Sequence, residues 1–154
     1  MTIAIDRKLE ELGLALPEAA APVAAYVPAV EAGGLLHVSG QLPFKDGALM
    51  TGRAGEDRDL AYAQEAAQRC ALMLVAQVKK YLDGDLSRVS RVVKLGVFVN
   101  SAGSFTDQPE VANGASELMQ ALFGDSGRHA RSAVGVPVLP RGAVVEVDAI
   151  FAIG

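Results

Sequence analysis

The sequence is poor in aromatic residues and in cysteine. It has no tryptophan, aromatic side chains make up 5% of it, and Cys70 is its one cysteine. A single cysteine excludes a disulfide within the chain, and no group of Cys and His residues has the spacing of a metal site. Because 51% of the 154 residues are hydrophobic, a substantial core is possible, and it must rely on Val, Leu and Ala. We expect one domain over 1–154 that holds no metal.

A basic surface and a long apolar segment are also missing. The net charge is −4, and the basic residues are scattered, with no run beyond Lys79-Lys80. A nucleic-acid partner usually requires a basic face. No apolar run reaches ~18 residues, the length that spans a membrane, and the start lacks the basic and apolar regions of a secretory signal. We therefore expect no nucleic-acid partner, no membrane span and a cytoplasmic location.

Hydrophobic periodicity predicts two long helices. Over 58–82, apolar residues recur at spacings of three and four and form one stripe, on which Cys70 lies as inert core. Over 108–123, Asp107 is a plausible N-cap and Gly124 a stop. A shorter helix is predicted over 6–13, inside an N-terminal extension covering 1–16.

The strands are predicted from β-type patterns and from turn residues between them. Their ranges are 26–30, 35–38, a small hairpin at 44–49, 93–99, 131–138 and 143–153. In the last range Val145 and Val147 point to one face, and Glu146 and Asp148 point to the other. Since each long helix has a single apolar stripe, the economical fold is one mixed sheet with both helices on one face. The other face would be partly apolar and uncovered, which favours an oligomer.

Three polar residues near the C-terminus could carry chemistry. Arg131 could hold a carboxylate or phosphate through paired hydrogen bonds, or could form an ordinary ion pair. Glu146 could orient a water or transfer a proton, or could be a solvated strand residue. His129 could act as a general base, although a histidine in a glycine-flanked loop is more often a structural group. If 131–153 forms a simple hairpin, Arg131 opposes a residue near 150, so spacing alone does not unite it with Glu146.

Several motifs, spread over about 17–152, resemble the RidA/YjgF family of reactive enamine/imine deaminases, also called the endoribonuclease L-PSP family. In chain order they are Pro22 to Tyr26, Val38-Ser39-Gly40-Gln41-Leu42-Pro43, Val97-Phe98-Val99, Val111-Ala112-Asn113, Ala130-Arg131-Ser132-Ala133-Val134, Leu139-Pro140 and Val145-Glu146-Val147-Asp148-Ala149-Ile150. The stretch from Ala130 onward is the specific one, and the others occur in the expected order.

The resemblance implies an α+β, chorismate-mutase-like fold with a mixed sheet of six strands, assembled as a homotrimer with ligand clefts between subunits. It implies hydrolysis of a 2-imino acid, formed from an enamine such as 2-aminoacrylate, to a 2-keto acid and ammonia. The resemblance also implies that no metal or organic cofactor takes part. Because the imine is intrinsically reactive, such an enzyme mainly has to hold the carboxylate and orient a water.

The resemblance also assigns residues. Arg131 would bind the substrate carboxylate, and Glu146 would position the water that attacks the C=N carbon. The remaining cleft positions are Tyr26, Ser39, Asn113 and Ala133, the last through its backbone.

The chain departs from the family at three places: Ala133 stands where deaminases often have cysteine, the extension before Pro17 is longer, and Gly124 to His129 forms a distinctive loop. These differences suggest a divergent branch and keep three hypotheses open. The first is an imine deaminase, and the second is a non-catalytic binder of small carboxylates such as 2-keto acids. The third is a ribonuclease or translation inhibitor, which the acidic balance and the lack of a basic, aromatic-lined groove disfavour.

Overall fold

The computed structural model describes residues 2–22 and 24–154. Met1, part of the predicted extension, and Val23, part of the Pro22 to Tyr26 motif, lie outside the described residues. The elements are α1 (Thr2–Glu11), β1 (Ala29–Ala32), β2 (Leu35–Gln41), β3 (Phe44–Lys45), β4 (Ala48–Leu49), α2 (Leu60–Tyr81), η1 (Leu86–Arg88), β5 (Val89–Asn100), α3 (Gln108–Phe123), η2 (Gly124–Gly127), β6 (Ala130–Val136), η3 (Pro140–Gly142) and β7 (Val145–Ile153).

The helices follow the predicted periodicity. The Asp59 side chain accepts a hydrogen bond from the Tyr62 N–H and caps α2, whose apolar stripe is buried. Asp107 stands at the N-cap of α3 as expected, but its side chain makes no capping hydrogen bond. The helix predicted over 6–13 begins earlier, at Thr2, and buries Ile5 and Leu9 against the rest of the molecule.

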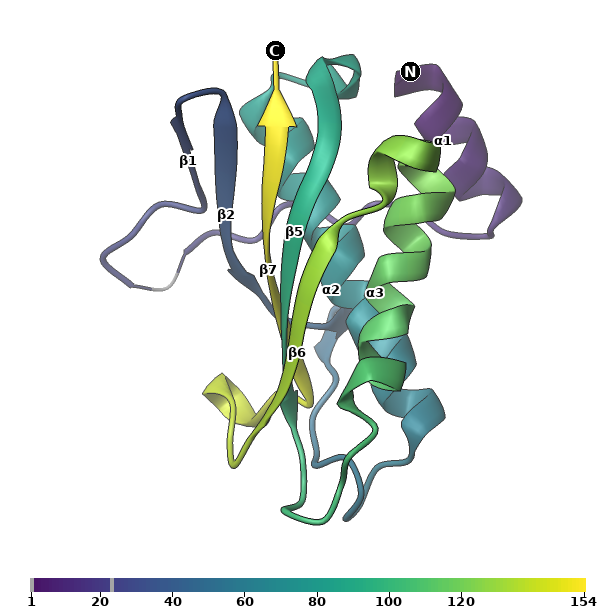
Figure 1. The fold of residues 1–154 in the computed structure, drawn as a ribbon, viewed down its shortest axis with the longest axis vertical. Helices are drawn as coiled ribbons and strands as arrows, with labels where there is room; N and C mark the ends of the chain where they lie inside the picture. The colour runs from purple at the N-terminus through teal and green to yellow at the C-terminus, as the bar shows by residue number, and fades with distance from the viewer. Residues whose placement is uncertain (1, 23) are drawn as a thin grey trace.

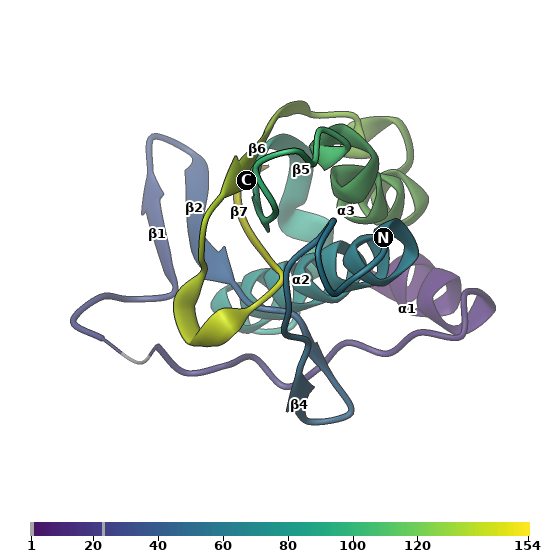
Figure 2. The ribbon, with the colours of Figure 1, turned by 90° about the horizontal axis from the view of Figure 1, so that it is seen from below.

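The main sheet is mixed, and α2 and α3 cover one of its faces, as predicted (Figure 1). Its strand order is β1-β2-β7-β5-β6, with β5 and β6 parallel and the other pairs antiparallel. The described strands give this sheet five members and not six, because β3 and β4 pair only with each other and project from the body (Figure 2). Tyr26 precedes the first strand, which begins at Ala29.

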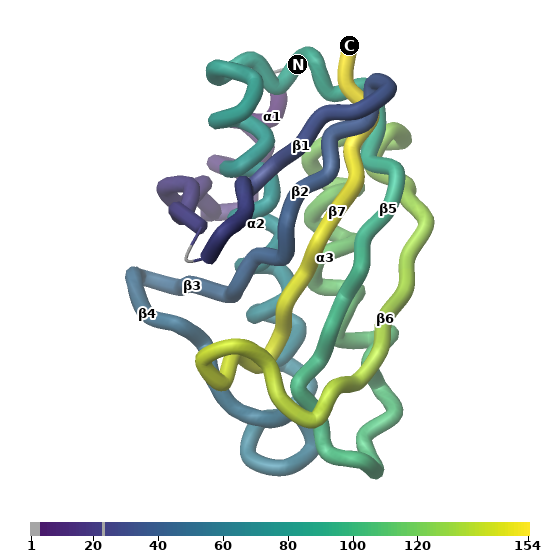
Figure 3. Tube along the Cα trace, turned by 90° about the vertical axis from the view of Figure 1, so that its left-hand side faces the viewer, coloured from purple at the N-terminus to yellow at the C-terminus, as the bar shows by residue number. Residues whose placement is uncertain are grey.

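The hairpin considered for 131–153 is wrong, because β5 lies between β6 and β7 (Figure 3). Helix α3 connects the end of β5 to the start of β6, so β6 runs parallel to β5. Leu95 on β5 has Arg131 as its neighbour on one side and Ala149 on the other. Arg131 therefore lies on the outer strand of the sheet, one strand away from β7.

The core lies between the sheet and the two long helices. Along β7 the buried residues are Val145, Val147, Ala149, Phe151 and Ile153, and the intervening Glu146 and Asp148 are on the opposite face, as predicted. The packing of α2 on α3 is unusually close at Gly114, where an added Cβ would overlap the backbone carbonyl of Gln64. Helix α3, which carries part of the candidate site, is therefore packed tightly against α2.

Candidate functional site

Arg131 is fixed between β6 and the first turns of α3. Its Nη1 donates to Oδ1 of Asn113 at 2.9 Å and to Oγ of Ser116 at 3.1 Å, and its Nη2 donates to the Pro109 carbonyl at 3.3 Å. A guanidinium has five N–H groups. These bonds use three of them, and within the described part of the chain the Nε–H and one N–H of Nη2 have no acceptor. Arg131 is thus oriented by acceptors on α3 and keeps two donors for a ligand.

His129 lies beside this arginine and is half-buried. Its Nδ1 is 2.6 Å from the Gly127 carbonyl, and its Nε2 is 2.9 Å from Oγ of Ser116. Burial lowers the pKa of His129, the Arg131 charge lowers it further, and the Gly127 hydrogen bond opposes both. Both ring nitrogens are occupied in a neutral imidazole, so the geometry supports the structural interpretation of His129 and not the general-base one.

Glu146 borders a separate cavity of about 660 Å³ on the other side of β7. Tyr26 and Ser39 line the same cavity. Burial raises the pKa of the Glu146 carboxyl, and the nearby Asp148 charge raises it further. A carboxyl whose pKa lies nearer neutrality is better suited to exchange a proton with a reacting group.

The cavity wall is held in place by polar side chains on β2 and α2. Ser39 Oγ donates to the Val27 carbonyl at 2.9 Å, so its hydroxyl fixes the segment that carries Tyr26. Gln77 on α2 donates to the Ala20 carbonyl at 2.7 Å and to Oε1 of Gln41 at 3.2 Å. These bonds tie the stretch before β1, which lines the cavity, to β2 and α2, and Tyr26 on that stretch is 47% exposed.

Two residues that line this cavity, Gly40 and Arg141, were not among the site residues predicted from the sequence. An added Cβ at Gly40 would overlap Oε2 of Glu146 and lie 2.9 Å from its Cδ. The missing side chain of Gly40 therefore leaves the space that the Glu146 carboxylate occupies. A glycine inside a strand pattern often marks such a close approach, and Ser39-Gly40-Gln41 could have been interpreted in that way. Arg141 also lines the cavity, with its guanidinium carbon 5.9 Å from the Phe44 ring centroid. No local pattern distinguished it from a turn residue.

The predicted site residues form two groups on opposite faces of the sheet. Arg131 faces α3 and contacts Asn113, and Ala133 follows it on the same face of β6. Glu146, Tyr26 and Ser39 line the cavity on the other side. The described chain therefore does not bring Arg131 and Glu146 into one cavity.

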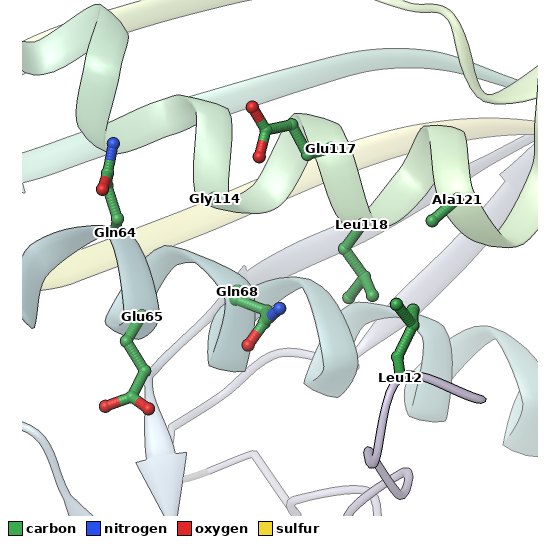
Figure 4. A pocket seen from close by; sticks show the side chains of 8 residues that line it. All are labelled: Leu12, Gln64, Glu65, Gln68, Gly114, Glu117, Leu118 and Ala121. Carbon is green, nitrogen blue, oxygen red and sulfur yellow. The ribbon is translucent and has the colours of Figure 1, made fainter. Parts of the chain in front are cut away.

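A further cavity, of about 390 Å³, lies on the outer surface of α2 and α3 and contains none of the predicted site residues. Figure 4 shows its lining of two glutamines, two glutamates, small and apolar residues, and no cation: Leu12, Gln64, Glu65, Gln68, Gly114, Glu117, Leu118 and Ala121. One of its acids, Glu65, is already paired with Lys45 at 2.9 Å. This surface is poorly suited to an anionic ligand.

The described residues offer neither a metal site nor a membrane-spanning helix. Over 2–22 and 24–154, no three or more His, Cys, Asp or Glu residues are grouped so that they could hold a metal ion. No helix in that part of the chain is both long and apolar enough to cross a membrane. Cys70 is fully buried, its pKa is raised chiefly by that burial, and its Sγ is 3.6 Å from the Val145 carbonyl.

Comparison with known proteins gives relatives over nearly the whole length. The chain is 57% identical over 148 residues to the protein TCP17 of Trypanosoma cruzi, covering 95% of this chain and 92% of TCP17. It is 27% identical over 142 residues to a 2-iminobutanoate/2-iminopropanoate deaminase of Dermatophagoides farinae, covering 91% and 94%.

A solved structure and a family model agree with these relatives. The crystal structure of the protein Atu1372 from Agrobacterium tumefaciens, whose function is unknown, superimposes with a TM-score of 0.94 at 49% identity, covering 99% of this chain and 94% of that one. The family model described as YjgF/chorismate mutase-like, with the further name endoribonuclease, matches residues 6–152. The fold, the ordered motifs and this match show that the chain belongs to the YjgF/chorismate mutase-like family, which is also the RidA family.

Proposed function

We propose that this protein hydrolyses 2-imino acids, formed from reactive enamines such as 2-aminoacrylate, to 2-keto acids and ammonia. The observation that carries the proposal is the hydrogen bonding of Arg131, which leaves Nε–H and one Nη2–H available for a carboxylate. Two such donors can bind both carboxylate oxygens in parallel. The imine deaminase among the relatives supports the same chemistry.

Glu146 would act as the general base for the attacking water. Its raised pKa favours a carboxyl that can take a proton from water as the oxygen attacks the C=N carbon. The addition forms a C–O bond, and Glu146 passes the proton it has taken to the imine nitrogen, so that the carbon bears a hydroxyl and an amine. Glu146 then carries the hydroxyl proton to the amine, the C–N bond breaks, ammonia leaves, and the carbonyl of the keto acid forms.

This mechanism requires a second copy of the chain, because Arg131 and Glu146 lie on opposite faces of the sheet in one copy. We propose a homotrimer in which each cleft combines Arg131 of one subunit with Glu146 of the partner subunit. The two surfaces differ, so the contact is heterologous, and such contacts can close into a ring. The exposed Val30 and Val134 on the sheet and the edge position of β6 support an interface there.

The test couples a PLP-dependent serine or threonine dehydratase to this protein and follows release of the 2-keto acid. The wild type should accelerate release, and Arg131→Ala should abolish the acceleration while the assembly stays intact by light scattering. Glu146→Gln should abolish turnover and leave carboxylate affinity nearly unchanged. No acceleration with several amino-acid precursors, from an assembled wild type, would refute the deaminase proposal.

A second candidate is a non-catalytic binder of small carboxylates such as 2-keto acids. It is favoured by one feature: the acceptors on α3 orient Arg131 without any contribution from Glu146. In that case 2-oxobutanoate binds to the wild type and not to Arg131→Ala, no precursor is turned over, and Glu146→Gln has wild-type affinity.

A further inference from the structure

We propose that Ser116 and His129 are positioning residues for Arg131: neutral His129 sets the direction of the Ser116 hydroxyl, and that hydroxyl holds the guanidinium in its ligand-binding orientation. The chain of contacts runs from the Gly127 carbonyl through the imidazole and Ser116 Oγ to Arg131 Nη1. The ligand in this inference rests on the function proposed above. The contacts themselves belong to the free protein and can be tested without a ligand.

The direction of each hydrogen bond follows from the chemistry of its ends. The Gly127 carbonyl can only accept, so Nδ1 of His129, 2.6 Å away, must carry the proton. In the neutral ring Nε2 is then unprotonated and accepts from the Ser116 hydroxyl at 2.9 Å. With its hydrogen committed to His129, Ser116 Oγ turns a lone pair toward Nη1 of Arg131 at 3.1 Å.

His129 is needed to orient the Ser116 hydroxyl, because a serine within a helix has another possible acceptor for its hydroxyl hydrogen. A serine hydroxyl within a helix can donate to the backbone carbonyl four residues earlier, which for Ser116 is that of Ala112. The imidazole Nε2, 2.9 Å from Oγ, is the alternative acceptor for the same hydroxyl hydrogen. Ser116 is only 6% exposed, so bulk water is poorly placed to take over this role.

The loop before β6 keeps the imidazole in place. Gly127 lies so close to α3 that an added Cβ would overlap the Met119 carbonyl. From β5, Arg91 Nη2 donates to the Asp125 carbonyl at 3.2 Å and to the Arg128 carbonyl at 2.9 Å. The distinctive 124–129 loop is thus attached to both α3 and the sheet, and it presents His129 to Ser116.

The pKa of His129 should report on ligand binding at Arg131. The Arg131 charge acts to lower the pKa of His129, so a carboxylate bound to Arg131 should offset that charge and raise this pKa. The other charged groups on the adjoining segments are Arg91 and Lys94 on β5, Asp125 and Arg128 around η2, and Glu110 and Glu117 on α3. They are present with and without ligand, so the change on binding reports on Arg131.

The first test uses the free protein and nitrogen-15 NMR. We expect a neutral His129 protonated on Nδ1, and slow rotation of the Arg131 Nη groups. Ser116→Ala should speed that rotation and Ser116→Thr, which keeps the hydroxyl, should restore slow rotation. His37→Gln, on an exposed position of β2, is the matched histidine control and should change neither feature. Wild-type rotation in Ser116→Ala would overturn the proposal.

The second test measures binding of 2-oxobutanoate by calorimetry. Ser116→Ala should weaken binding roughly 5- to 20-fold, as expected when a hydrogen bond to a charged group is lost, while Ser116→Thr stays within about twofold. Ligand should raise the pKa of His129 in the wild type. Equal affinity in the wild type and Ser116→Ala would refute the positioning role. No binding by the wild type, with the NMR contacts intact, would instead refute the proposed function and leave the positioning of Arg131 established.

Discussion

The charged side chains on the two faces of the sheet have different surroundings. Arg131 is surrounded by oxygen acceptors on α3, whereas Glu146 lies near another acid and has its pKa raised. Asp148 also has a raised pKa because it is partly buried, although the Gly96 N–H and Lys94 oppose this effect. Two neighbouring carboxyls with raised pKa values are typical of a site that exchanges protons, but they cost stability at neutral pH.

Asp148→Asn should lower the pKa of Glu146, because the second cause of its elevation is the Asp148 charge. A carboxyl with a raised folded-state pKa binds more protons than its unfolded form just above its ordinary pKa of 4.5, so stability falls as pH rises through that window. The variant should therefore be more stable than the wild type at neutral pH and lose this advantage in acid. Carbon-13 NMR of the carboxyls and thermal unfolding against pH would measure both effects. Glu117→Gln, an exposed acid on α3, is the control; an unchanged Glu146 titration in Asp148→Asn would contradict the coupling.

Gly40→Ala should strongly reduce the proposed deaminase activity without unfolding the protein. The added methyl group overlaps the end of the Glu146 side chain, which can swing away, so the backbone need not move. Because displacement removes the proposed proton acceptor, we expect a loss of about 100-fold in deaminase turnover. Gly103→Ala is the matched control, since a Cβ there meets nothing within 4 Å. Full activity in Gly40→Ala would show that the position of Glu146 is not required.

At the scale of elements, local patterns predicted what depends on local sequence. The apolar stripes correctly predicted α2 and α3, and the alternation along β7 correctly predicted that Glu146 lies on the face away from the helices. The position of β5 between β6 and β7 was missed, because strand pairing is decided by the α3 crossover and not by either strand. For the same reason no local pattern indicated that Ser116, one helical turn after Asn113, contacts Arg131.

Gly114→Ala should destabilise the protein through the contact of α2 with α3. Alanine gains about 1 kcal/mol over glycine within a helix. That gain is outweighed here, because the Cβ overlaps the backbone carbonyl of Gln64, which cannot rotate aside. We expect a net loss of about 1–3 kcal/mol in the free energy of unfolding, measured in urea. Gly103→Ala again serves as the control, and a stabilised Gly114→Ala would refute the close packing of these helices.

At the scale of the whole molecule, the separation of Arg131 from Glu146 leads to a prediction about mixed assemblies of the proposed trimer. Arg131→Ala and Glu146→Gln should each be inactive as pure assemblies. In mixed assemblies some clefts receive a wild-type Arg131 from one subunit and a wild-type Glu146 from the partner subunit. Such complementation is possible only if the two residues come from different chains.

The expected recovery can be calculated. With equal amounts of the two variants and random mixing, each residue at a cleft is wild type in half of the cases, so about a quarter of the clefts are complete. Denaturing the variants together, refolding them and assaying the keto acid should return about a quarter of wild-type activity, whereas each variant refolded alone returns none. Since the faces of one sheet separate Arg131 from Glu146 within a chain, a site confined to one subunit would require a rearranged sheet, and it would give no recovery at any mixing ratio.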